Sequence, residues 1–128
     1  MIARLWKGWT TLENADAYEK LLRERVLPGL QSIDGYRGGY LLRQDGSDEV
    51  EFAVLNLFDS LDAVRAFAGP EYTVPVFEPE ARQLLSKVEP IARHYEVKVE
   101  ASSPLRNQGT AAICNIFSQI SCLFSHSG

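Results

Sequence analysis

His94 is the side chain in the first hundred residues best suited to acid–base chemistry at neutral pH, because imidazole titrates close to that pH. The second histidine, His126, lies near the chain end, where we expect solvent exposure. Two interpretations of His94 stay open. It is a base that deprotonates or orients a phenolic substrate, or it is a structural histidine with a hydrogen bond at a sheet or subunit interface.

Arg4 is the second candidate catalytic residue, and it shares one face of a strand-like segment with Trp6. An inward-pointing charge needs a partner whatever the function, so a buried interface ion pair is one interpretation. The other is a cation that stabilises a developing oxyanion.

Aromatic side chains could line a flat pocket for an aromatic ligand, although ordinary core packing also explains them. Tyr72 follows Gly69 and Pro70 in an irregular link that could cover a pocket mouth. Asn56 interrupts an apolar strand, so its amide needs a structural or a ligand hydrogen bond. The candidate substrate-binding residues are Trp6, Trp9, Tyr40, Phe52, Asn56, Phe67, Tyr72 and Phe77.

Other chemistries have no recognisable pattern in this sequence. No histidine and cysteine spacing suits zinc, and no phosphate-binding glycine loop, nucleophile elbow or nucleotide fingerprint occurs. We therefore expect no metal and no cofactor. Both cysteines, Cys114 and Cys122, lie in the last stretch, which fits a reducing compartment.

The hydrophobic pattern predicts a β-α-β-β-α-β order and an α+β fold. One layer of helices leaves the other face of such a sheet bare, and a bare apolar face needs a partner. The paired Gly38 and Gly39 predict a bulge or a close approach within a strand. The expected strands are residues 2–9, 36–44, 49–58 and 93–100, and the expected helices begin near Asn14, at Asp59 or Ser60, and at Pro79, the last of them covering residues 80–88.

Length and charge limit the function classes. The chain has 128 residues and a net charge of −4 at pH 7, which argues against nucleic acid and anionic membranes as partners. No apolar run reaches about twenty residues and no signal segment is evident, so we expect a cytoplasmic protein. Residues 1–100 are the expected domain. Residues 101–128 are an expected extension, read as a linker with a short amphipathic helix or as a loosely ordered segment.

Four stretches of the sequence carry a recognisable family pattern: Met1–Trp6, Pro28–Gly39, Asn56–Phe67 and Ala92–Val97. Together they resemble the antibiotic biosynthesis monooxygenase-like family of the dimeric α/β-barrel superfamily. The resemblance implies a ferredoxin-like protomer with an antiparallel four-stranded sheet, a homodimer in which two bare sheet faces form a barrel, and a small-molecule pocket between sheet and helices. In that strand order the first strand lies beside the last, so Arg4 could pair with Glu96 near His94.

Two functions follow as hypotheses. The first is a cofactor-independent monooxygenase acting on a small aromatic, phenolic or quinol, polyketide-like substrate. The second is a non-catalytic dimeric protein that binds a small hydrophobic molecule or acts as a scaffold. Related families degrade haem, but that activity implies an asparagine on the first strand and a tryptophan and a histidine on a helix, which this sequence lacks.

Overall fold

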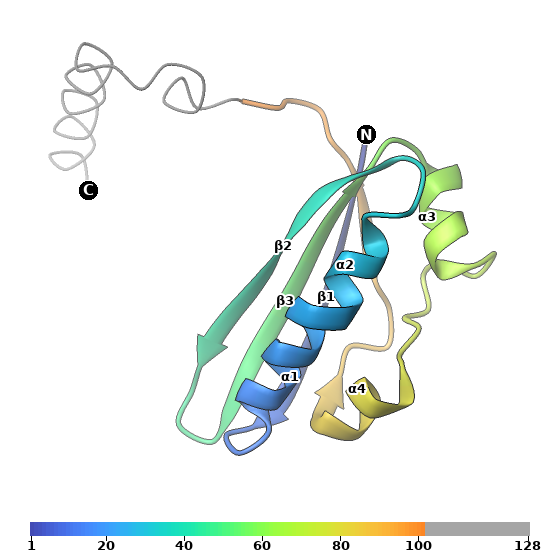
Figure 1. Cartoon of the computed structure of the whole chain (residues 1–128). Coiled ribbons are helices and arrows are strands. Elements are labelled where there is room, and N and C mark those ends of the chain that lie inside the picture. The colour runs from blue at the N-terminus through green and yellow to red at the C-terminus, as the bar shows by residue number, and fades with distance from the viewer. Residues whose placement is uncertain (102–128) are drawn as a thin grey trace, which may run out of the picture. The chain divides into compact units, whose positions relative to one another are not determined.

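The computed structural model describes residues 1–101, and residues 102–128 of the predicted extension lie outside the described residues. Five strands form one antiparallel sheet (Figure 1). They are β1 (Ile2–Thr11), β2 (Tyr36–Asp45), β3 (Glu49–Phe58), β4 (Leu85–Val88) and β5 (Arg93–Glu96). The α+β, ferredoxin-like prediction is confirmed.

The predicted number of strands was wrong by one, because the fourth strand is divided. β3 pairs with one edge of β1, while β4 and β5 share the other edge, at Gly8–Thr10 and Ile2–Leu5 respectively. Pro90 lies between β4 and β5, and its missing N–H interrupts the ladder there. The predicted helix over 80–88 was also too long. Helix α4 (Pro79–Leu84) ends where β4 begins.

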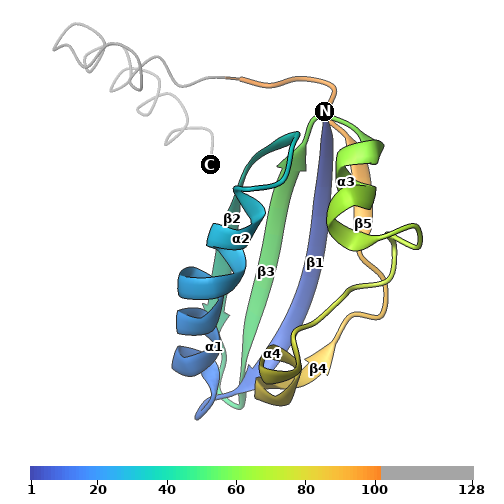
Figure 2. The same cartoon turned by 45° about the vertical axis from the view of Figure 1, so that its right-hand side comes forward.

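The helices all lie on one face of the sheet (Figure 2). The first helical segment is continuous through α1 (Ala15–Leu21), a π-helical turn η1 (Leu22–Val26) and α2 (Leu27–Leu30). Pro28 cannot donate a backbone hydrogen bond, and the wider π turn just before it accommodates that gap. Helix α3 (Leu61–Ala68) begins at Ser60, whose Oγ accepts a hydrogen bond from the backbone N–H of Ala63 at 3.3 Å.

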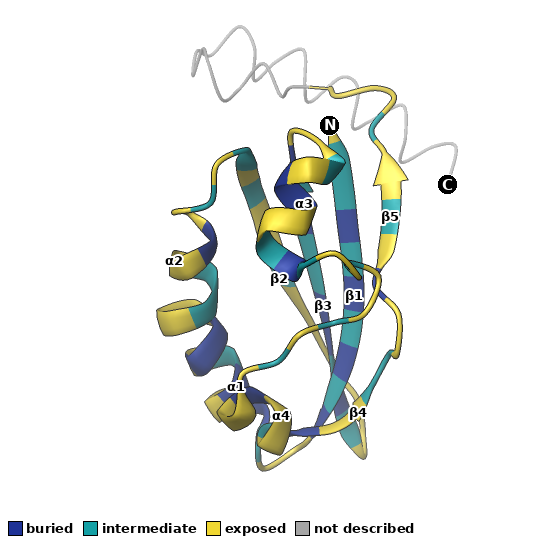
Figure 3. Cartoon of the chain, turned by 90° about the vertical axis from the view of Figure 1, so that its right-hand side faces the viewer, coloured by how far each residue is buried: buried dark blue, intermediate teal, exposed yellow. Residues whose placement is uncertain are grey.

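Burial alternates along β1, as a strand covered mainly on one side requires (Figure 3). Arg4 and Trp6 are buried beneath the helices, whereas Leu5 points to the opposite face. On that face Leu5 lies opposite Leu55, and Leu55 lies opposite Tyr40, which is 53% exposed. Among the described residues no second layer covers this face, so an apolar surface is open to a partner.

The main core lies between the helices and the sheet and surrounds Phe52, which is fully buried. Tyr18 of α1 packs edge-on against Phe52, with ring centroids 4.9 Å apart. Within residues 1–101, no helix has the length and the apolar character needed to span a membrane.

Candidate functional site

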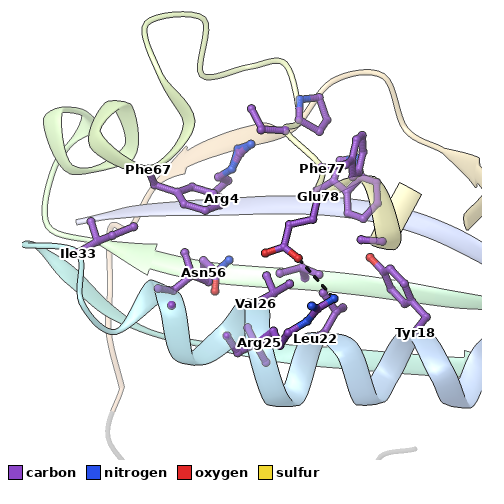
Figure 4. Close-up of a pocket in the computed structure, with 18 residues that line it drawn as sticks. Arg4, Tyr18, Leu22, Arg25, Val26, Ile33, Asn56, Phe67, Phe77 and Glu78 are labelled. Atoms are coloured by element: carbon purple, nitrogen blue, oxygen red, sulfur yellow. Dashed lines mark ion pairs between the residues drawn. The ribbon is translucent and has the colours of Figure 1, made fainter. Parts of the chain in front are cut away.

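A cavity of about 370 Å³ lies between the sheet and the helical layer (Figure 4). Strands β1 and β3 form its floor, η1 and α2 form one wall, and the link from α3 to α4 forms the other. Its volume is in the range of small-molecule sites, and its surface is mainly apolar. The residues of the floor and of the link wall are Arg4, Trp6, Val54, Asn56, Phe67, Pro75, Val76, Phe77, Glu78 and Ala81.

Three polar side chains form one row across the sheet on its helical face. The register places Asn56 of β3 opposite Arg4 of β1, and Arg4 opposite His94 of β5. Arg4 and Asn56 line the cavity, while His94 is not part of its lining. Glu96 lies opposite Ile2, so the predicted neighbour of Arg4 was wrong, and His94 takes that position.

Arg4 is a buried cation, with 6% of the residue exposed. Its Nη1 donates a hydrogen bond to the backbone carbonyl of Tyr72 at 3.3 Å, and its guanidinium lies over the Phe67 ring at 5.4 Å. No carboxylate among the described residues forms an ion pair with it. Burial lowers the pKa of Arg4, although a guanidinium remains charged at neutral pH.

His94 is held neutral beside this cation. Burial lowers the pKa of His94, the charge of Arg4 lowers it further, and a hydrogen bond with the backbone of Ala92 opposes both effects. Its Nε2 is buried without a hydrogen-bond partner among the described residues, and its ring meets the Tyr72 ring edge-on at 4.9 Å. A neutral imidazole therefore adds no second positive charge next to Arg4.

Asn56 is oriented by Tyr36, whose hydroxyl donates to Asn56 Oδ1 at 3.0 Å. That bond uses the amide oxygen and leaves the two N–H donors of a side chain that lines the cavity. Gly39 permits the arrangement, because a Cβ there would overlap Asn56 Oδ1. A register shift between Tyr36 and Gly38 marks the bulge that the glycine pair predicted.

Some of the remaining predicted substrate-binding residues line the cavity, and others lie elsewhere in the structure. Trp6, Phe67 and Phe77 line the cavity, and Trp6 and Phe77 pack edge-on at 5.2 Å. The other four are absent from the lining. Trp9 and Tyr40 lie on the bare face of the sheet, Phe52 lies in the core beneath Tyr18, and Tyr72 packs against His94 and Arg65.

Sequence reasoning missed the helical wall. Tyr18 of α1 and Leu22 and Val26 of η1 line the cavity, although their helical spacing is equally typical of ordinary core packing. Burial strongly raises the pKa of Tyr18, so its hydroxyl stays protonated. At the mouth, Arg25 of η1 forms ion pairs with Glu80 and with Glu78, the latter at 3.9 Å, and the pairs join the two walls.

Comparisons with known proteins bear on the fold. No protein-family model and no curated protein sequence matches the chain. Among solved structures, a Deinococcus radiodurans protein named as an antibiotic biosynthesis monooxygenase aligns with a TM-score of 0.57 and 15% identity, over 80% of this chain and 97% of that chain. A Bacillus cereus protein of the same name aligns with a TM-score of 0.56 and 13% identity, over 80% and 95%.

This chain has the fold of the antibiotic biosynthesis monooxygenases. The haem-degrader MhuD from Mycobacterium tuberculosis, whose structure has two haems bound in its active site, shares the fold. It aligns with a TM-score of 0.55 and 18% identity, over 80% of this chain and 100% of MhuD. The shared fold does not by itself identify a ligand, so the chemistry of the cavity residues has to be considered instead.

The lining residues show what kind of chemistry the cavity offers. Within residues 1–101, no group of three or more His, Cys, Asp or Glu side chains is placed to hold a metal ion. The cavity lining contains no histidine or cysteine, two of the side chains that bind haem iron, although it does include Tyr18. Apolar and aromatic walls over a floor with one buried guanidinium and one amide suit a small aromatic molecule that carries oxygen atoms.

Proposed function

We propose that this protein is a cofactor-independent monooxygenase that acts on a small aromatic phenol or quinol of the polyketide type. The observation that carries the proposal is the cavity, whose aromatic walls enclose a floor with Arg4 and Asn56. A largely apolar pocket with a few convergent polar groups is the arrangement expected of a small-molecule site. The shared fold with proteins named as monooxygenases supports the proposal.

The chemistry needs an electron-rich ring that can itself reduce dioxygen. For an anthrone, loss of a proton to water or buffer outside the cavity gives an anion, and this anion transfers an electron to O₂. The resulting superoxide and ring radical then combine into a peroxide. Loss of water from the peroxide leaves a ketone, so a ring CH₂ and O₂ become C=O and H₂O. One oxygen atom enters the product, and the ring carbon supplies all the electrons.

The side chains of the floor have distinct roles in this proposal. Arg4 pairs with the anionic oxygen of the substrate, where burial makes its charge more effective than it would be in water. The amide of Asn56 donates to a second oxygen on the ring. His94 is a positioning residue, because it packs beside Arg4 in neutral form and does not line the cavity.

Oxygen uptake and product formation with anthrones and hydroquinones test this function. We expect the wild-type protein to consume one O₂ per anthrone, and Arg4→Gln to reduce the rate by about 10²–10³-fold, as the loss of one oxyanion donor does. His94→Ala should have a smaller effect. Binding of these compounds without any turnover would instead support the alternative, a non-catalytic binding protein of the same fold.

We also propose that a second copy of the chain covers the bare sheet face. The row of Leu5, Leu55 and Tyr40 forms an apolar strip across three strands, and apolar surfaces of this kind mark association sites. Sedimentation should show a dimer at micromolar concentration. Leu55→Lys, which places a charge on this strip, should shift the protein to a monomer, and a monomeric wild type would contradict the proposal.

A further inference from the structure

We infer that the cavity binds its ligand as an anion that is already ionised in solution, an acidic phenol or an aromatic carboxylate, with the negative oxygen on Arg4. The inference rests on the proposed function in taking the cavity as the substrate site. It adds the charge state of the ligand, and it removes the need for a base inside the cavity.

Arg4 differs from other arginines of the domain in its burial and in its lack of an ion pair among the described residues. Exposed arginines such as Arg43 and Arg65 form ion pairs with carboxylates at 2.7–2.9 Å and at 2.8 Å. Arg4 is far more buried, yet its polar contact among the described residues is one backbone carbonyl, that of Tyr72. A buried charge is costly unless it is paired, so the partner that the fold does not provide is expected to come from the ligand.

The second step is the polarity of the cavity floor. A guanidinium has five N–H donors and no acceptor, and the bond to Tyr72 occupies only part of this capacity. The Tyr36 hydroxyl occupies Asn56 Oδ1, so Asn56 too presents its N–H groups. The floor therefore provides donors and positive charge, and a complementary ligand provides acceptor oxygens with negative charge.

The third step concerns proton removal. The imidazole of His94 is the nearest candidate base to Arg4 along the polar row, but it is outside the cavity lining and its Nε2 is buried. Glu78 does line the cavity, but at the mouth, where it lies in ion-pair range of Arg25. A ligand whose acidic group reaches Arg4 thus meets no base there, which favours a ligand that enters ionised.

The expected magnitude follows from the charge of Arg4. An opposite charge within about 4–6 Å lowers the pKa of an acid by about 1–3 units. One unit corresponds to a tenfold difference in affinity between the two protonation states, so the cavity should prefer the ionised form by about 10–1,000-fold.

Titration with 4-nitrophenol tests this preference, because the absorbance of 4-nitrophenol reports its ionisation directly. We expect the pKa of the bound phenol to lie about 1–3 units below that of the free phenol in the wild-type protein. Arg4→Gln should abolish the shift, and Arg4→Lys should retain part of it. Arg23→Gln, which alters an exposed arginine of the same helical segment outside the cavity lining, is the matched control and should leave the shift intact.

A bound pKa equal to or above the free value would overturn the inference, and so would a shift that persists in Arg4→Gln. A second pair of probes, 2-naphthoate and the uncharged 2-naphthamide, has matched shape, and the wild type should bind the carboxylate more tightly. If the protein binds neither anion, the inference is wrong. None of these measurements needs turnover, so a shift in a protein without oxygenase activity would reject the proposed function alone.

Discussion

Replacing Arg4 by methionine should stabilise the fold while it abolishes anion binding. The guanidinium is buried without an ion-pair partner among the described residues, so its desolvation is not recovered by a carboxylate. Methionine is unbranched, flexible and apolar, and it can occupy the same path beside Phe67. Arg4 would then lower the stability of the free protein and yet be required for binding. This combination is expected of a site that is adapted to an anionic ligand.

The magnitude follows from three contributions. Burial of an unpaired ion costs several kcal/mol. The hydrogen bond from Nη1 to the Tyr72 carbonyl returns about 1.5–3 kcal/mol, and the contact with the Phe67 ring returns about 0.5–2 kcal/mol. Together these returns, about 2–5 kcal/mol, nearly offset the cost. Since methionine removes the desolvation cost and keeps an apolar contact with Phe67, we expect Arg4→Met to be more stable by up to about 1 kcal/mol, which would raise the Tm of a domain of this size by up to about 4–8 °C.

Urea unfolding followed by tryptophan fluorescence measures this change, at one protein concentration because subunit association contributes to stability. The control is Arg43→Met. Arg43 forms ion pairs with Asp16, Glu19 and Asp45, so its removal should lower the stability instead. If Arg4→Met lowers the free energy of unfolding by about 1 kcal/mol or more, the fold itself compensates the buried charge. An anionic ligand would then no longer be needed to explain the buried charge of Arg4.

Three further predictions concern the surroundings of the site. Gly39→Ala should destabilise the protein by about 1–3 kcal/mol in urea unfolding, since its Cβ would overlap Asn56 Oδ1, whereas Gly29→Ala has free space and should stabilise a helix by up to about 1 kcal/mol. Burial and the charge of Arg4 lower the pKa of His94 in the folded state, so the unfolded state binds a proton more readily. The free energy of unfolding should therefore fall as the pH drops through the ordinary histidine pKa of about 6.5, and it should fall less in His94→Gln. Ser60→Ala removes the hydrogen bond to the Ala63 N–H and should cost about 1 kcal/mol, measured as a lower Tm.

The sequence predicted helices and strands well where a regular hydrophobic pattern or a helix-capping residue determines them. The alternation along β1 placed Arg4 and Trp6 on one face correctly, and Ser60 does cap α3. The divided fourth strand was missed because residues 85–88 continue an apolar helical pattern as readily as they form a strand. Pairing with Gly8–Thr10 of β1, a contact distant in sequence, makes them a strand.

The composition of the site was harder to predict than the fold, because it depends on register. The position of His94 opposite Arg4 is set by where the chain re-enters the sheet after Pro90, and no local pattern encodes that position. The sequence also does not show which face of the sheet an aromatic side chain occupies. Trp9 and Tyr40 look like pocket residues in the sequence, but their strand positions place them on the bare face.

Strand alternation also separates the two interactions proposed for this protein. On β1, Arg4 points to the cavity and its neighbour Leu5 points to the bare face, where it meets Leu55. Because the cavity lies on the helical face and the proposed dimer contact lies on the opposite face, we expect a ligand there to need no side chain from a second copy. The Leu55→Lys monomer should therefore still lower the pKa of bound 4-nitrophenol. If the shift disappears with the dimer, a partner subunit completes the site, and the cavity of a single chain is not sufficient for anion binding.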